Sequence, residues 1–476
     1  MLDPIAMMPA TELAARIARR ELSCREVMIA TLDHIDRANP AVNAIVALRP
    51  RAALLAQAEA ADATTPAGPL HGLPHAVKDL AATTDMPTTL GSPLFAGHRP
   101  ARDAIFVERL RAAGAILIGK TNTPEFGLGS QTYNPVYGTT GNAYDPARAA
   151  GGSSGGAAVA LALRMVPLAD GSDFAGSLRN PAGWNNVFGF RPSAGRVPYG
   201  PASEVFMTSI GIEGPMARTV TDLALLLSVM AGYDPRAPQS LTGDPAVFTQ
   251  PLGRDMAGVR IGWLGDLGGV PMAPGMLDLC QSGLQRLTAA GVTIEPATLG
   301  VGRDTIWRSV TTLRHGFQAG RLAPLYNDPA KRAQMKPEAV WEIEGGLNLR
   351  ATDLYQASVQ RSAVYEAFRV AFTQYDFLAL PTAQVFPFDK AVHWPTEVAG
   401  TAMDSYHRWM EIVAGPSLAG LPTAAVPAGF GPDGLPSGIQ LIGPPQQDFS
   451  VLQLAHAYEQ VSRDVLGRLP PLLSGM

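Results

Sequence analysis

The sequence predicts an α/β fold in which one mixed β-sheet is flanked by helices. Helical and strand-like periodicities alternate along nearly the whole chain. Hydrophobic residues make up 46% of the 476 positions, which is enough apolar surface for a sizeable core. The 49 glycines and 41 prolines indicate many turns between these elements.

Amphipathic spacing predicts helices at 11–20 and 25–38, followed by a strand at 41–48. Short apolar runs predict the later strands, and longer periodic runs bounded by capping residues predict the later helices. The other expected strands are 73–77, 115–118, 165–168, 259–263, 292–294, 377–380, 423–426 and 439–442. The other expected helices are 103–113, 156–164, 219–230, 275–290, 353–374 and 448–461.

The whole chain, 1–476, is expected to form a single domain, because no internal repeat or low-complexity linker interrupts it. The stretch 234–253 has the composition of a loop and is the best candidate for a boundary between two lobes of that domain. The stretch 382–400, rich in proline and phenylalanine, is expected to form a loop beside a substrate cleft.

Charge and cysteine content exclude several classes of protein. The net charge is −4 and basic residues form no stripe, so a nucleic-acid partner is not expected. Cys24 and Cys280 are too few for a disulfide framework or a cysteine-based metal cluster. The N-terminal segment lacks the basic and apolar regions of a targeting signal, and no apolar run reaches the length of a membrane span. A cytoplasmic protein without membrane contact is therefore expected.

Lys78 directly follows the apolar run 73–77 and is one of five lysines in a chain with 37 basic residues. A lysine at the end of a buried strand is normally paired or functional. The alternative is an edge strand from which the side chain extends into water.

The stretch Gly151–Gly156 reads GGSSGG and precedes a helical run. It lacks the Lys-Ser/Thr pair of a phosphate-binding P-loop, and a flexible linker would not normally adjoin a buried helix. It also satisfies the G-x-S-x-G pattern of an α/β-hydrolase esterase, with Ser153 or Ser154 as nucleophile. That alternative needs a strand before the turn and a histidine, for which the candidates are His315, His393, His407 and His456.

A second serine, Ser177, follows Ser153 by 24 residues within DGSDFAGSLRNPAG. Its small neighbours let backbone N–H groups approach a substrate carbonyl closely, as an oxyanion hole requires. A tight turn without function would have a similar composition.

Together these features resemble the amidase signature family. Lys78, GGSSGG and DGSDFAGSLRNPAG occur in the order and spacing of that family, and the likeness covers about residues 10–460, with a signature core at about 70–215. Further matching blocks are GLPHAVKD, GKTNTPEFG, GFRPSAGRV, YDFLALPT and GLPT followed by GIQLIG.

The resemblance implies a Ser–cis-Ser–Lys triad that hydrolyses an acyl C–N bond. Ser177 would be the nucleophile, Ser153 the bridging serine on a cis peptide after Gly152, and Lys78 the base. Burial would lower the pKa of Lys78, so that its neutral amine takes a proton from Ser153, which takes one from Ser177. The expected oxyanion hole consists of the backbone N–H groups of Phe174, Ala175, Gly176 and Ser177.

Supporting residues are expected around this triad. A charge pair between Asp173 and Arg179 would hold the nucleophile loop rigid. Gly127 and Gly129, within the segment 127–131, and the segment 386–396 are expected near the substrate. No metal or organic cofactor is implied, and His71 and His75 make a poor metal pair because Gly72 and Pro74 interrupt a helix there.

Phe174 and Ala175 replace the threonine and glycine usual in the family and weigh against the glutaminase subunit of tRNA-dependent amidotransferases. The expected protein is a free-standing bacterial-type amidase for small aryl or alkyl amides, with carbamates and lactam-derived oligomers as further candidate substrates. A homodimer is a family-level expectation. The alternatives are that glutaminase subunit, the esterase, and an inactive binding module.

Overall fold

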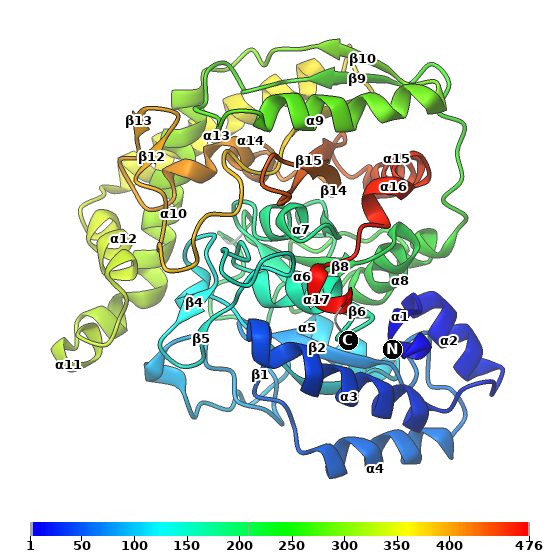
Figure 1. The fold of residues 1–476 in the computed structure, drawn as a ribbon. Helices are drawn as coiled ribbons and strands as arrows, with labels where there is room; N and C mark the ends of the chain where they lie inside the picture. Colours follow the sequence, from blue (N-terminus) through cyan, green and yellow to red (C-terminus); the bar gives the residue numbers. More distant parts are fainter. Residues whose placement is uncertain (1–2, 208, 475–476) are drawn as a thin grey trace.

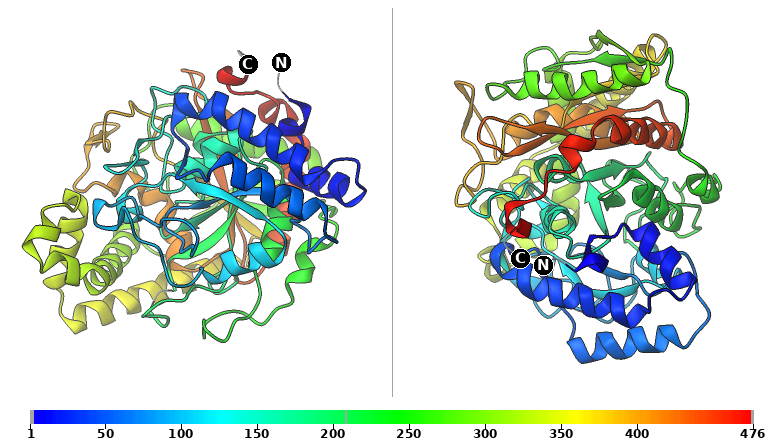
Figure 2. Two further views of the ribbon diagram at one scale, coloured as in Figure 1. Left: turned by 90° about the horizontal axis from the view of Figure 1, so that it is seen from below. Right: turned by 45° about the vertical axis from the view of Figure 1, so that its right-hand side comes forward.

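The computed structural model describes residues 3–207 and 209–474 and confirms the predicted α/β class. Its centre is an 11-stranded mixed sheet with the strand order β1-β3-β2-β6-β8-β7-β14-β15-β11-β9-β10. Figure 1 shows this order running from β1 and β2 in the lower half to β9 and β10 at the top, with helices packed around it. The chain ends lie side by side in every view (Figure 2).

The strands of the large sheet are short. They are β1 (Ile45–Val46), β2 (Pro74–Lys78), β3 (Ile116–Thr121), β6 (Leu168–Asp173), β7 (Phe188–Arg191), β8 (Ile212–Ala217), β9 (Arg260–Trp263), β10 (Thr293–Pro296), β11 (Phe377–Pro381), β14 (Thr423–Phe430) and β15 (Pro436–Ile442). Two small hairpins add β4 (Tyr133–Asn134), β5 (Gly138–Thr139), β12 (Glu397–Val398) and β13 (Thr401–Ala402).

The longer helices surround the sheet and one another. They are α2 (Ala10–Ala18), α3 (Cys24–Val42), α4 (Arg51–Asp62), α5 (Ile105–Ala112), α6 (Gly155–Ala162), α8 (Val220–Met230), α9 (Met276–Gln285), α10 (Arg303–Tyr326), α12 (Pro337–Leu347), α13 (Ala351–Ala371) and α15 (Asp448–Val461). Shorter helices are α1 (Pro4–Met7), α7 (Asn180–Trp184), α11 (Pro329–Arg332), α14 (Ala414–Leu418), α16 (Arg463–Leu466) and α17 (Pro471–Ser474).

Two expected strands are displaced in the structure. The strand expected at 41–48 is reduced to Ile45–Val46, because α3 continues to Val42 and ends at Asn43, whose φ of 53° is left-handed. The strand expected at 165–168 instead begins at Leu168 and extends through the polar sequence LADGSD. Glycine and aspartate are rare in strands, so composition alone points away from this segment.

Parallel pairing around β2 positions the functional side chains. β2 lies between β3 and β6 and runs parallel to both. Because the carboxyl ends of parallel strands meet at one edge, Lys78 at the end of β2 lies near the loop that follows β6. β8 runs antiparallel to β6, and this register sets Glu213 opposite Ser172.

The sheet joins strands from both sides of the segment 234–253. That segment connects α8 to β9 and contains a short 3₁₀ helix at Pro245–Thr249. The division of one domain into two lobes at this segment stays a prediction. Among the helices of the described residues, none is both long and apolar enough to cross a bilayer.

Candidate active site

Lys78 is a buried lysine at the end of a central strand, with 1% of its surface exposed. Its Nζ donates to the hydroxyls of Ser153 at 2.8 Å, Ser154 at 2.9 Å and Ser172 at 3.0 Å. The alternative of an edge strand with a solvated lysine is therefore wrong, because β3 and β6 cover both edges of β2.

Burial lowers the pKa of Lys78 to about 8, because an ammonium ion is poorly solvated there. The carboxylates of Glu213, Asp170 and Asp173 oppose this shift. Burial likewise raises the pKa of Glu213 to about 8, against the opposing effect of Lys78. With a pKa of about 8, a minor fraction of Lys78 is a neutral amine near pH 7, and this fraction grows as pH rises. A proton acceptor must be in this neutral form.

The GGSSGG segment is buried and enters α6 directly, so it is not a flexible linker. The peptide bond between Gly152 and Ser153 is cis. Side chains from a neighbouring loop hold the segment, since Ser130 donates to the Gly152 carbonyl and Thr132 to the Gly151 carbonyl, both at 2.7 Å.

The nucleophile-elbow alternative finds no support in this geometry. The residues before Gly151 form turns and isolated bridges rather than a strand. The hydroxyls of Ser153 and Ser154 contact Lys78 instead of a histidine. Of the four candidate histidines, His407 reaches the same cavity, where its ring bonds to Ser405 at 3.0 Å.

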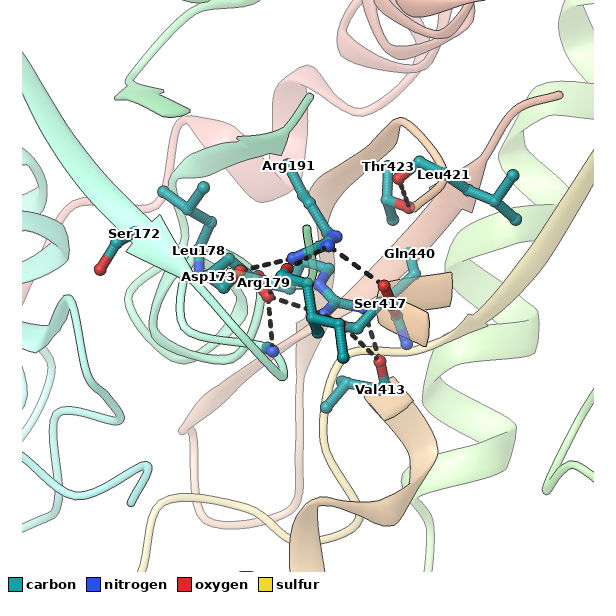
Figure 3. A network of polar contacts seen from close by, with 12 residues as sticks. Ser172, Asp173, Leu178, Arg179, Arg191, Val413, Ser417, Leu421, Thr423 and Gln440 are labelled. Carbon is teal, nitrogen blue, oxygen red and sulfur yellow. Dashed lines mark hydrogen bonds and ion pairs between the residues drawn. The ribbon is translucent and has the colours of Figure 1, made fainter. Parts of the chain in front are cut away.

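The loop that follows β6 is anchored by a buried ion network (Figure 3). Arg179 donates to the Asp173 carboxylate at 2.9 and 3.0 Å, and Arg191 donates to it at 3.0 Å. The expected Asp173–Arg179 pair is thus present and is joined by a second arginine. Burial alone would raise the pKa of Asp173, but Arg179 and Arg191 hold it well below its usual range.

The same carboxylate also binds the backbone of the loop. Asp173 accepts the N–H of Gly176 at 2.8 Å and that of Leu178 at 3.0 Å. The Gly176 N–H, one of four expected oxyanion donors, therefore points to Asp173 rather than to a substrate. The other three expected donors are the N–H groups of Phe174, Ala175 and Ser177.

A cavity of about 220 Å³ opens beside these groups. Ser153, Ser172 and Ser177 line one side of it, together with Gly127 and Gly129 from the segment 127–131. The remaining walls are mostly apolar and aromatic, with contributions from Leu80, Phe126, Phe174, Tyr199, Trp307, Phe317 and Met410.

The expectation that 386–396 borders the substrate is wrong for the described lining of this cavity. That segment packs elsewhere, since the Phe388 carbonyl accepts the Ala149 N–H at 2.7 Å. The Phe388 ring also packs against Trp184, with ring centroids 5.6 Å apart. Phe388 and Trp394 pack against the buried cluster that contains Trp184 and Trp409, and Phe386 packs against the main core.

Sequence reasoning missed Glu213 and the whole contribution of α10. Arg314 on α10 donates to Glu342 at 2.6 Å and to the Tyr406 hydroxyl at 3.0 Å. Its guanidinium lies over the Phe174 ring at 5.1 Å, and Phe317 lies 6.3 Å from that ring. The α10 residues that line the cavity include Trp307, Val310, Arg314, Phe317 and Arg321, which are three or four positions apart. This spacing is typical of one helix face and could have been recognised in the sequence.

Among the described residues, no group of three or more metal-binding side chains gathers. His75 bonds to Asp170 at 2.9 Å, and His71 bonds to the Ala61 carbonyl at 3.1 Å, so the two rings have separate partners.

Comparison with known proteins identifies the class. The family model described as Amidase matches residues 26–452, and the chain therefore belongs to the amidase signature family. The protein is accordingly an enzyme that hydrolyses C–N bonds of amides.

Individual relatives cover nearly the full chain. It is 33% identical to an acylamidase of Rhodococcus erythropolis, over 95% of both chains. It is 34% identical to a glutamyl-tRNA(Gln) amidotransferase subunit from Chloroflexus aurantiacus, over 95% of this chain and 96% of that protein. The solved structure of a bacterial aryl acylamidase matches all of both chains with a TM-score of 0.92 and 28% identity.

Proposed function

We propose that the protein is a free-standing amidase that cleaves small aryl amides through an acyl-enzyme on Ser177. The observation that carries this proposal is the buried Lys78 amine, 2.8 Å from Ser153, beside a cavity that Ser177 also lines. A serine hydroxyl needs a nearby base to become a nucleophile, and a desolvated lysine can be that base.

In this mechanism Lys78 accepts a proton from Ser153 while Ser153 accepts the proton of Ser177. The Ser177 oxygen attacks the amide carbonyl, and the resulting oxyanion accepts hydrogen bonds from the N–H groups of Phe174, Ala175 and Ser177. The relay then reverses, so that Lys78 returns a proton through Ser153 to the leaving amine. Water, activated by the same relay, hydrolyses the acyl-enzyme.

The choice of an aryl amide rests on the walls of the cavity. Phe174 and Phe317 lie with ring centroids 6.3 Å apart, and Trp307 also lines the space. Aromatic rings favour tilted or edge-on contact with another ring, beyond the gain from burying its surface. Simple alkyl amides would fit the same cavity with fewer such contacts.

The test is hydrolysis of an anilide by the purified chain alone. Ser177→Ala should reduce kcat by about 10⁴-fold or more, because loss of the nucleophile disables the whole unit. Ser203→Ala, an exposed serine in the loop before β8, is the matched control and should keep full activity. Full activity of the Ser177→Ala enzyme would overturn the proposal.

A second candidate is the glutaminase component of an amidotransferase, favoured by the 34% identity to such a protein. It predicts weak turnover by the isolated chain and strong glutamine hydrolysis only when partner subunits are added. Robust anilide turnover by the isolated chain decides for the free-standing amidase.

A further inference from the structure

A second cavity of about 130 Å³ lies apart from the active-site cavity and shares none of its lining residues. It is bordered by Met7 and Pro9 near the start of the chain and by the segment after α16 near its end. Figures 1 and 2 show these two ends of the chain side by side. The end of α6, the residues just before α8, and Tyr144, Asn186 and Val187 complete the walls.

Three arginines line this cavity: Arg164, Arg218 and Arg468. Within the described residues, none of the three forms an ion pair with a carboxylate, although arginines elsewhere in the chain often do. Arg164 and Arg218 are half-buried, whereas Arg468 is exposed at the rim. A half-buried guanidinium normally has an anionic partner, because desolvation of an unpaired charge is costly.

The contacts of the two half-buried arginines, Arg164 and Arg218, include no carboxylate within the described residues. Arg218 donates to the Val166 carbonyl at 2.9 Å and to the Met8 carbonyl, which are neutral acceptors. Arg468 lies 4.0 Å from the Phe430 ring centroid. The Nε of Arg164 is buried and has no hydrogen-bond partner within the described residues.

Asp222 is the carboxylate that stabilises the charge of Arg218, but its oxygens already accept other hydrogen bonds. Asp222 accepts the backbone N–H groups of Ala10 at 3.0 Å and Thr11 at 2.8 Å. Burial lowers the pKa of Arg218 to about 9, and the like charge of Arg164 lowers it further, while Asp222 opposes both. The cavity is therefore a site of net positive charge.

We propose that this cavity binds a phosphate group, held by Arg164, Arg218 and Arg468. Guanidinium groups bind tetrahedral oxyanions through paired, charge-assisted hydrogen bonds, and several can share one anion. The bound anion would tie the first helices and the last segment of the chain to the end of α6. This site is separate from the proposed catalytic site, and binding of the anion would increase the free energy of unfolding.

The test is thermal unfolding of the full chain with millimolar inorganic phosphate against chloride at equal ionic strength. Because a ligand that binds only the folded state stabilises it, phosphate should raise Tm by several degrees and saturate. Titration calorimetry should give one phosphate per chain. Equal shifts in phosphate and chloride would overturn the proposal.

Two variants make the test specific. Arg164→Gln should abolish the phosphate-dependent rise in Tm and leave anilide hydrolysis unchanged, whereas the exposed control Arg254→Gln should keep the rise. An undiminished phosphate-dependent rise in the Tm of Arg164→Gln would overturn the proposal. If Arg164→Gln fails to fold, Arg468→Gln takes its place in the same test. Glycerol phosphate is a second probe, which tests whether the site accepts a phosphoryl group carried by a larger molecule. A rise in Tm with both probes supports such a ligand, and a rise with inorganic phosphate alone supports free phosphate.

Discussion

Two buried lysines occupy neighbouring parallel strands, and the contrast between them is the reason we propose Lys78, and not Lys120, as the catalytic base. Lys78 ends β2, and Lys120 lies in β3, paired in register with Val77. Burial lowers the pKa of each to about 8. A depressed pKa alone therefore does not distinguish a catalytic lysine from a structural one.

The partners of the two amines differ. Lys120 donates to the Ala81 carbonyl at 2.7 Å and to the Thr88 hydroxyl at 3.0 Å, and the carboxylate of Asp79 lies close enough to raise its pKa. Lys78 instead donates to three serine hydroxyls, two of which line the active-site cavity. A chain of hydroxyls that ends at a cavity can carry a proton to substrate, whereas a closed set of structural acceptors cannot.

The largest expected effect on turnover comes from replacing Lys78, and the comparison is made with replacement of Lys120. Lys78→Ala should lower kcat for an anilide by about 10³-fold or more, since general acid–base catalysis is lost. Lys120→Met should keep kcat within a few-fold but lower the free energy of unfolding by about 1–3 kcal/mol, because buried acceptors lose their donor. Steady-state kinetics and denaturant unfolding of both variants measure this, and an equal loss of kcat in Lys120→Met would break the comparison.

The next effect concerns pH. A base must be deprotonated, so activity should rise with pH through about 8, the lowered pKa of Lys78. The Glu213 carboxylate favours the ammonium form, so Glu213→Gln should move this rise to lower pH by roughly 1 unit.

The pH profile of kcat measures that shift. Lys120→Met is the control and should leave the midpoint in place, because the Lys120 amine donates to Ala81 and Thr88 and not to the serine hydroxyls around Lys78. A midpoint that stays fixed in Glu213→Gln, or moves to higher pH, would contradict the assignment of Lys78 as the base.

The smallest expected effect comes from single hydroxyls. Ser172→Ala removes one of the three hydroxyl acceptors of the Lys78 amine and should lower kcat by about fivefold, equivalent to one modest hydrogen bond. Thr88→Val removes the matching hydroxyl of Lys120 and should leave kcat unchanged. Equal kinetics of the two variants would show that the hydroxyl cluster around Lys78 does not matter for turnover.

Much of the candidate site could be predicted, because its residues lie at strand ends, turns and loops that neighbouring residues in the sequence reveal. Lys78 ends a compact apolar run, and Ser153 opens a glycine-rich entry to a helix. Asp173 and Arg179 are six residues apart and pair within one loop. Strand ends and loop composition are readable along the chain, because they depend on neighbours in sequence.

The sequence by itself determined the α/β class, the family, and the order of Lys78, Ser153 and Ser177. The tertiary structure decided that Glu213 lies opposite Ser172, near enough to raise the pKa of Lys78, and that Arg314 packs over Phe174. Both arrangements arise through contacts between segments distant in the sequence. The tertiary structure also decided that Asp173 accepts the Gly176 N–H and that the segment 386–396 packs outside the lining of the cavity. Register and packing across the sheet fix these contacts, and periodicity along the chain carries no information about them.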